Sequence, residues 1–175
     1  MPHLHLSLHN EEGEPRSLSS RALGEDEALA LLCSAEITGS QLVPWGSNYT
    51  FAVLLETSDG EEHLAIYKPR AGEAPLYDFP DGTLYLRETA SYVLSRWLAW
   101  DIVPPTVVRD GPHGEGSVQL YVTPADEDDP DITRFWRRRH LDVERLVLFD
   151  YITNNADRKI GHCLRDAGGK IWGID

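Results

Sequence analysis

The 175-residue chain has only two cysteines and no apolar run as long as a membrane span. Cys33 and Cys163 lie far apart and lack the spacing of metal ligands, so we expect reduced, buried thiols in a cytoplasmic protein. A transmembrane helix needs about 20 consecutive apolar residues, and none is predicted here. The N-terminus lacks a basic start followed by an apolar core, which predicts that there is no signal peptide.

Positive charge is also scarce. The chain carries 16 Lys and Arg against 29 Asp and Glu, a formal net charge of -13. Such a surface argues against nucleic acid as the main partner and against stable association with an anionic membrane. A nucleotide remains a candidate ligand, because a few local cations and a metal can hold its phosphates. The 41% hydrophobic content and the length fit one globular domain, or two small lobes that share a cleft.

The N-terminal half reads as a small sheet with two helices. Residues 1–24 are polar, with His3, His5 and His9, and predict a flexible segment or an edge strand, with a metal-binding tract as the rarer alternative. Acids at residues 25–27 mark the first turn of a short helix. A hairpin turn is expected at Ser58-Asp59-Gly60. Strands are expected at residues 37–43, 49–56, 63–68, 106–109 and 117–122, and a second helix at 83–100.

The C-terminal part changes in character. Residues 123–131 are acidic, contain two prolines and predict a hinge, and residues 132–175 then form a second lobe. Four arginines between Arg134 and Arg139 make a basic patch on an expected helix at 132–140, either a solvated face or an anchor for an acidic group. An apolar helix is expected at 141–153, followed by a polar loop and two short strands.

The polar loop carries the residues best suited to chemistry. Asp157 stands beside Arg158, and His162 follows five residues after Asp157. Asp175 ends the last expected strand. Phosphoryl transfer uses such a set, because a carboxylate orients the attacking hydroxyl and further ligands hold a metal on the phosphates. An Asp-Arg neighbour pair alone is also a common surface ion pair.

Three features of the N-terminal half complement this loop. Lys68 ends an apolar strand and either reaches solvent or points into a cleft. Glu88, on the following helix, is either a solvated glutamate or a partner that holds Lys68 in that cleft. The turn Gly46-Ser47-Asn48 is either a plain hairpin or a cradle of backbone N–H groups for phosphates.

In this order the pieces resemble the protein-kinase-like superfold, most closely its phosphatidylinositol 3- and 4-kinase-like branch and a bacterial family of small kinase-like proteins. The segment Asn155-Ala156-Asp157-Arg158-Lys159-Ile160-Gly161-His162 is similar to the Asp-Arg-His-x-x-Asn loop of that branch. The resemblance covers residues 37–175. It implies an α+β fold with two lobes: residues 25–122 form an antiparallel sheet with one helix, and residues 132–175 form an incomplete helical lobe that is truncated at Asp175.

The resemblance also assigns roles. It makes Asp157 the catalytic base, and Lys159 would neutralise charge on the transferred phosphoryl group. Lys68 would contact the ATP phosphates with Glu88 as its partner. The metal, Mg²⁺ or Mn²⁺, would be held by His162 and Asp175, with His162 at a position where the family has asparagine. Gly46, Ser47 and Asn48 would form the loop that covers the phosphates. Gln119, Tyr121 and Val122 would belong to the hinge strand, residues 119–122, which holds adenine by backbone groups.

The expected function is ATP-dependent transfer of the γ-phosphate to a hydroxyl of a protein or small molecule. Two alternatives stay open. The first is a nucleotide-binding pseudokinase that regulates a partner, which is favoured by His162 in place of a metal-binding asparagine and by the incomplete second lobe. The same fold can instead transfer AMP from ATP to its target.

Overall fold

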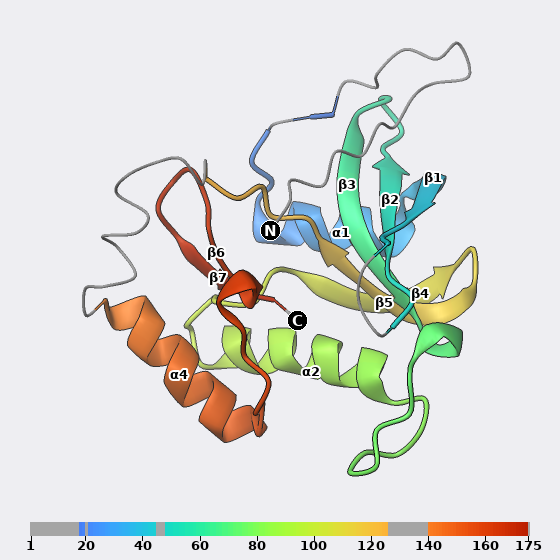
Figure 1. The fold of residues 1–175 in the computed structure, drawn as a ribbon. Coiled ribbons are helices and arrows are strands. Elements are labelled where there is room, and N and C mark those ends of the chain that lie inside the picture. Colours follow the sequence, from blue (N-terminus) through green and yellow to red (C-terminus); the bar gives the residue numbers. More distant parts are fainter. Residues whose placement is uncertain (1–17, 20, 45–47, 126–139, 175) are drawn as a thin grey trace. The chain divides into compact units, whose positions relative to one another are not determined.

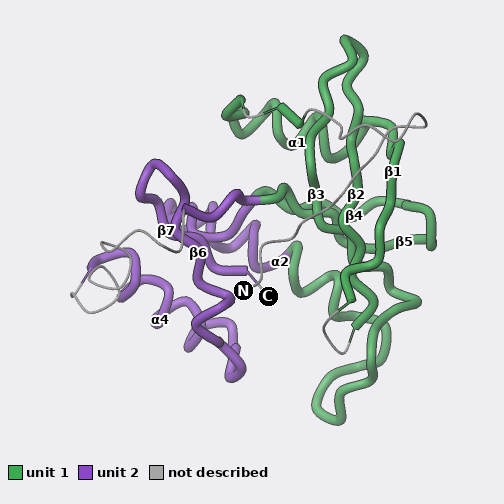
Figure 2. Tube along the Cα trace, turned by 45° about the horizontal axis from the view of Figure 1, so that its top comes forward, with its two compact units in different colours: residues 1–89, 105–121 green, residues 90–104, 122–175 purple. Residues whose placement is uncertain are grey.

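The computed structural model describes residues 18–19, 21–44, 48–125 and 140–174. The fold is α+β, and the chain divides into two compact units (Figure 2). Unit 1 comprises Met1–Thr89 and Pro105–Tyr121, and unit 2 comprises Ala90–Pro104 and Val122–Asp175. Several predicted features lie outside the described residues: the three N-terminal histidines, Gly46, Ser47, most of the expected hinge, the arginine patch and Asp175.

Unit 1 is built on a five-stranded antiparallel sheet in the order β1-β2-β3-β5-β4 (Figure 1). The strands are β1 Glu36–Leu42, β2 Phe51–Glu56, β3 Glu62–Pro69, β4 Thr106–Gly111 and β5 Gly114–Leu120. All five strands predicted from the sequence are therefore confirmed. The predicted turn between β2 and β3 is confirmed as well: Gly60 has φ 83° and donates from its N–H to Thr57 O at 2.9 Å. Glycine adopts this left-handed backbone without a steric cost.

Helix α1, Glu25–Ser34, covers one face of this sheet. Leu31 and Leu32 of α1 pack against alternate residues of the strands, because successive side chains of a strand point to opposite faces. The shared core consists of Leu31, Leu32, Ala35, Val53, Leu55, Ala65, Tyr67, Val107 and Val118. Cys33 lies on the outward side of α1 and is exposed, so the expectation of a buried thiol is wrong for Cys33. Both cysteines are free thiols.

Helix α2, Leu84–Trp97, begins in unit 1 and continues into unit 2. Glu73, just after the short helix η1 (Arg70–Gly72), caps its start, since its carboxylate accepts hydrogen bonds from Leu84 N at 3.0 Å and Tyr85 N at 2.8 Å. The helix ends three residues earlier than expected. Ala99 and Asp101 have φ of 54° and 49°, a left-handed backbone that cannot continue a helix.

Unit 2 contains helix α4, Leu141–Thr153, the short helix η2, Ile160–His162, and a hairpin of β6, Cys163–Arg165, and β7, Ile171–Gly173. Helix α4 has the bounds predicted from its apolar pattern, and it ends at Asn154, which has φ 54°. Phe149 and Ile171 are buried in this unit. In the described part of the chain, no helix has the length and apolarity needed to cross a membrane.

Candidate functional site

Lys68 and Glu88 form an ion pair within unit 1. Nζ of Lys68, at the end of β3, donates to Oε1 of Glu88 on α2. Only 18% of the Lys68 side chain and 14% of the Glu88 side chain is exposed. The predicted pairing of these two residues is therefore present. Contact of Lys68 with ATP remains a prediction.

Ser117 of β5 completes this cluster. Its hydroxyl donates to Oε2 of Glu88 at 2.7 Å, so each oxygen of the carboxylate accepts from a different side chain. Ser117 is 1% exposed and lies directly opposite Lys68 in the pairing of β3 with β5. A carboxylate held from two sides loses little freedom, and it keeps the lysine ammonium in one place.

The contacts at the start of α2 fix the position of Glu88 relative to Lys68. Glu73 caps the first turn, and Tyr85 of that turn donates from its hydroxyl to Oε2 of Glu115 on β5 at 2.5 Å. This hydrogen bond raises the pKa of Tyr85, because it favours the protonated phenol. Glu88 lies one turn after Tyr85 and on the same side of the helix. The cap and the tyrosine together therefore hold the Glu88 carboxylate level with Lys68.

Asn48 is the one described residue of the predicted phosphate-covering turn. Its Oδ1 accepts from Ala74 N at 2.7 Å, and the neighbouring Tyr49 N donates to Gly72 O at 3.0 Å. Asn48 and Tyr49, just before β2, are thus anchored to the residues that follow β3. The phosphate-binding role of Asn48 stays a prediction, and it would use the backbone or the amide nitrogen.

Most residues of the stretch predicted to hold adenine already form hydrogen bonds within the sheet. Gln119 pairs with both Ile66 and Thr106, and its Nε2 donates to Thr106 Oγ1 at 2.9 Å. Tyr121 N donates to Leu64 O at 3.1 Å, and burial raises the pKa of its phenol. Among the described residues no backbone partner of Val122 is found. Val122 is therefore the member of this stretch best able to offer N–H and C=O to a base.

In unit 2, Asp157 and Lys159 form an exposed ion pair. Lys159 Nζ lies 2.9 Å from Asp157 Oδ2, and the side chains are 64% and 76% exposed. The hydrogen bond from Lys159 holds the pKa of Asp157 below its ordinary value, and the lysine charge acts in the same direction. Asp157 thus stays ionised well into acidic solution. The structure places the predicted base and the predicted charge-neutralising lysine together.

The loop that carries Asp157 is held by a second, less exposed network. Arg158 donates from Nε and Nη2 to the two carboxylate oxygens of Asp150 on α4, at 2.9 and 2.8 Å. Asn155 Nδ2 donates to Asp150 Oδ1 at 3.0 Å, and Asn155 N donates to Asp150 O at 2.8 Å. A bidentate arginine–carboxylate pair fixes orientation as well as distance. The loop is thereby tied to the end of α4.

Arg158 also reaches the residues around the predicted metal ligands. Its Nη1 donates to His162 O at 3.3 Å and to Ile174 O, the residue before Asp175. Ile174 N donates to His162 O at 2.9 Å. His162 is therefore fixed through its backbone next to the end of the described chain. Within the described residues no group of three His, Cys, Asp or Glu side chains is arranged to hold a metal, and Asp175 lies outside them.

Sequence reasoning missed three residues of these networks: Ser117, Asp150 and Arg158. A usable signal exists for Asp150, because a carboxylate between Phe149 and Tyr151 in an apolar helix needs a partner once it is buried. Arg158 looked like a flanking cation of Asp157. No signal exists for Ser117, since its role depends on which residue β3 places opposite it.

The chain is similar in sequence to a mycobacterial protein. No family model matches the chain. The chain is 38% identical, over 184 residues of alignment, to Protein Rv2133c of Mycobacterium tuberculosis (strain ATCC 25618 / H37Rv). The alignment covers 86% of this chain and 66% of that relative, so the chain spans just under two thirds of the relative's length. The name of the relative states no activity.

Proposed function

We propose that the protein is an ATP-dependent phosphotransferase of the protein-kinase-like type. The observation that carries the proposal is the cluster of Lys68, Glu88 and Ser117 in unit 1. A lysine that is 18% exposed and fixed by a carboxylate is suited to bind a phosphate group, because its charge is both oriented and only partly hydrated. The loop of unit 2 supplies a carboxylate with an adjacent cation, the second requirement of phosphoryl transfer.

In this proposal each residue has one role. Lys68 binds phosphate oxygens of ATP, Glu88 orients Lys68, and Val122 offers backbone groups to adenine. Asp157 accepts the proton of the acceptor hydroxyl as its oxygen bonds to the γ-phosphorus. The bond from the γ-phosphorus to the bridging oxygen breaks, and ADP leaves with that electron pair. Lys159 offsets negative charge on the transferred group.

A divalent metal fits the donor chemistry of the expected ligands only in part. His162 offers an imidazole nitrogen and Asp175 a carboxylate oxygen, a mixed pair that suits Mn²⁺ better than Mg²⁺. Bound there, the metal would neutralise phosphate charge. Arg158 needs no metal for its role: its hydrogen bonds to His162 O and Ile174 O hold the backbone of His162 and of the residue before Asp175.

The first test is ATP binding by calorimetry, with Mg²⁺, with Mn²⁺ and with neither. Lys68→Met removes a charge-assisted hydrogen bond worth about 1.5–3 kcal/mol, so we expect ATP affinity to fall about tenfold or more. Lys170→Met is the matched control, because Lys170 is an exposed lysine that stacks on Trp172 in the β6–β7 hairpin. Absence of ATP binding under all three conditions, or equal losses in the two variants, contradicts the proposal.

The Asp157–Lys159 ion pair favours a second candidate, a nucleotide-binding pseudokinase that acts on a partner protein. A carboxylate whose pKa is held low is a weak proton acceptor. A pseudokinase binds ATP through Lys68 but does not release ADP in the presence of any acceptor. Release of ADP in the presence of an acceptor separates the two, and in an active enzyme Asp157→Asn should abolish that release and leave ATP affinity unchanged. The mass added to a modified target distinguishes phosphate from AMP transfer.

A further inference from the structure

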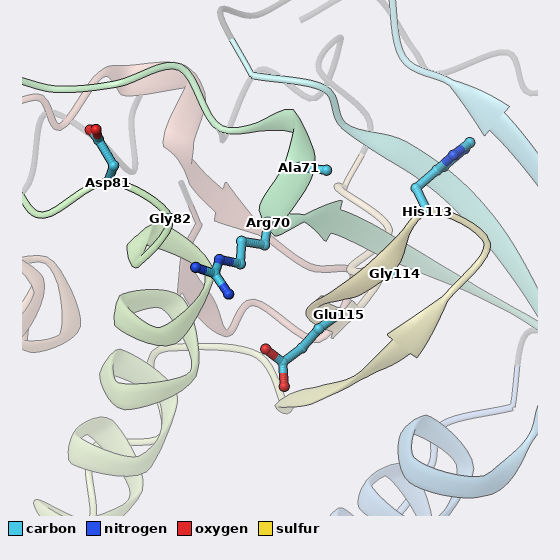
Figure 3. A pocket seen from close by; sticks show the side chains of 7 residues that line it. All are labelled: Arg70, Ala71, Asp81, Gly82, His113, Gly114 and Glu115. Atoms are coloured by element: carbon cyan, nitrogen blue, oxygen red, sulfur yellow. The ribbon is translucent and has the colours of Figure 1, made fainter.

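An open pocket of about 470 Å³ lies in unit 1 just beyond the end of β3 that carries Lys68. It is lined by residues of η1, of the approach to α2 and of the β4–β5 hairpin: Arg70, Ala71, Asp81, Gly82, His113, Gly114 and Glu115. Its size falls in the range of small-molecule sites. In Figure 3 the Arg70 side chain reaches from η1 toward Gly82, Glu115 lies on the same side, and His113 points away from Arg70.

Arg70 is the notable side chain of this pocket. Its guanidinium makes no hydrogen bond or ion pair with any residue that the structure describes. It packs instead against bare backbone: a Cβ added to Gly82, which has φ +70°, would lie 2.7 Å from Arg70 Nε. A guanidinium presents five N–H donors in a planar fork, and here that fork is held beside a cavity.

The residues around Arg70 are placed in the same way as those of the Lys68 cluster. Pro69 is extended, so Arg70 lies on the same side of the chain as Lys68. Glu115 stands two residues before Ser117 on β5, and Tyr85 stands one turn before Glu88 on α2. Arg70, Glu115 and Tyr85 thus form a second set of cation, carboxylate and hydroxyl next to the set of Lys68, Glu88 and Ser117.

The two sets differ in which side chains donate to the carboxylate. In the first, Glu88 accepts from both the cation and the hydroxyl. In the second, Glu115 Oε2 accepts from Tyr85 at 2.5 Å, and no ion pair joins Glu115 to Arg70 among the described residues. Arg70 therefore keeps its full capacity to bind an external anion, and the second carboxylate oxygen of Glu115 can accept from a donor.

We propose that this pocket is a second ligand site of unit 1, which binds a small molecule carrying a phosphate or carboxylate group next to an ammonium or hydroxyl group. The oxyanion binds the Arg70 fork, and the neighbouring donor binds Glu115. Such a ligand pairs with the charges of Arg70 and Glu115 at once. An anion alone would bind less well, because Glu115 repels it.

The site is also placed to influence the Lys68 cluster, a consequence that rests on the proposed function. Ser117 lies on β5, which contributes Gly114 and Glu115 to the pocket wall, and the lining residues 70–71 and 81–82 directly follow β3 and shortly precede α2. A ligand that engages Glu115 acts on Tyr85 and so on the first turn of α2. Coupling between two sites is reciprocal, so a pocket ligand that changes ATP affinity has its own affinity changed by ATP by the same factor.

The test uses phosphoethanolamine, inorganic phosphate and ethanolamine as separate probes, followed by the amide and arginine side-chain NMR signals of the whole chain without nucleotide. Phosphoethanolamine should shift signals of residues 70, 82 and 113–115. Arg70→Gln should weaken its binding about tenfold, the size expected for a charge-assisted hydrogen bond. Arg87→Gln, which removes an arginine that lies over the Phe79 ring, should leave the affinity unchanged.

Glu115→Gln gives the sharpest outcome. It should weaken phosphoethanolamine, which loses its ammonium partner, and strengthen inorganic phosphate, which loses a repulsion. Equal effects of Arg70→Gln and Arg87→Gln overturn the proposal, as does ethanolamine binding as tightly as phosphoethanolamine. The probes need no ATP, so a protein that binds them at Arg70 but fails to bind ATP would retain this site and lose only the proposed function.

Discussion

At the scale of single residues, Ser117 determines how firmly Glu88 can hold Lys68. Ser117→Ala leaves Glu88 Oε2 without its donor in a place that solvent barely reaches. We expect the free energy of unfolding to fall by about 1–3 kcal/mol, the cost of an unsatisfied buried acceptor. Urea denaturation measures the change. Ser34→Ala is the control, because the exposed Ser34 hydroxyl bonds only to Ala30 O of its own helix and its loss should cost little.

A double-mutant cycle with Glu88→Gln shows whether the serine acts through Glu88. If it does, Ser117→Ala costs less in the Glu88→Gln background than in the natural protein, because the amide can no longer be a charged acceptor. Strictly additive costs would mean that Ser117 stabilises the sheet by packing alone.

The second residue-scale prediction concerns Asp157. Lys159→Ala removes the hydrogen bond that lowers the pKa of Asp157, so that pKa should rise toward its ordinary value. A folded-state pKa below the unfolded value stabilises the protein above the unfolded pKa, and this contribution is lost as the pH falls through the folded pKa. Carboxyl NMR titration measures the shift. Lys170→Ala takes the same charge from elsewhere in unit 2 and should leave Asp157 unmoved.

At the scale of elements, the C-terminal end of helix α1 depends on a positive charge that strand β4 supplies. The helix has Glu25, Asp26 and Glu27 in its first turn but no base in its last turn. Arg109 of β4 supplies that charge, since its Nη1 donates to Leu32 O at 3.0 Å and to Ala35 O at 2.9 Å. A cation at the C-terminal end of a helix stabilises its carbonyls.

Arg109→Ala should therefore lower stability by about 1–2 kcal/mol and speed hydrogen exchange in the last turn of α1. Arg109→Lys keeps the charge but cannot bond two carbonyls with the same geometry, so it should restore only part of the loss. Unchanged exchange in α1 with Arg109→Ala would show that the core contacts of Leu31 and Leu32 alone hold the helix.

Elements were also the level at which the sequence was most informative. The apolar pattern of residues 141–153 predicted the bounds of α4, and the strand-like segments between turn signals predicted all five strands of the sheet. The end of α2 could not be predicted, because Ala99 and Asp101 adopt a left-handed backbone that their residue types rarely favour. The local pairing of Lys68 with Glu88 was predictable from resemblance. The role of Ser117 was not predictable, because it follows from the register of β3 and β5 that places Ser117 opposite Lys68.

At the scale of the whole molecule, the two candidate networks lie in different units. Lys68, Glu88 and Ser117 belong to unit 1, and Asp150, Arg158 and Asn155 belong to unit 2. The hydrogen bonds described above for each network join residues of the same unit. Proteins open in cooperative parts when contacts within a part are denser than those around it. Damage to one network should therefore stay in one unit.

Arg158→Met tests this separation. Among the described residues it leaves Asn155 as the one side-chain partner of Asp150, whose side chain is 11% exposed. The loss should cost about 2 kcal/mol, less than the 3–5 kcal/mol of a fully buried broken pair. Hydrogen exchange should quicken in α4 and the β6–β7 hairpin but not in β2, β3 and β5. Arg145→Met, which removes the more exposed Arg145–Asp142 pair of α4, should change exchange little. Equal acceleration in both units would instead show that the chain opens as one cooperative body.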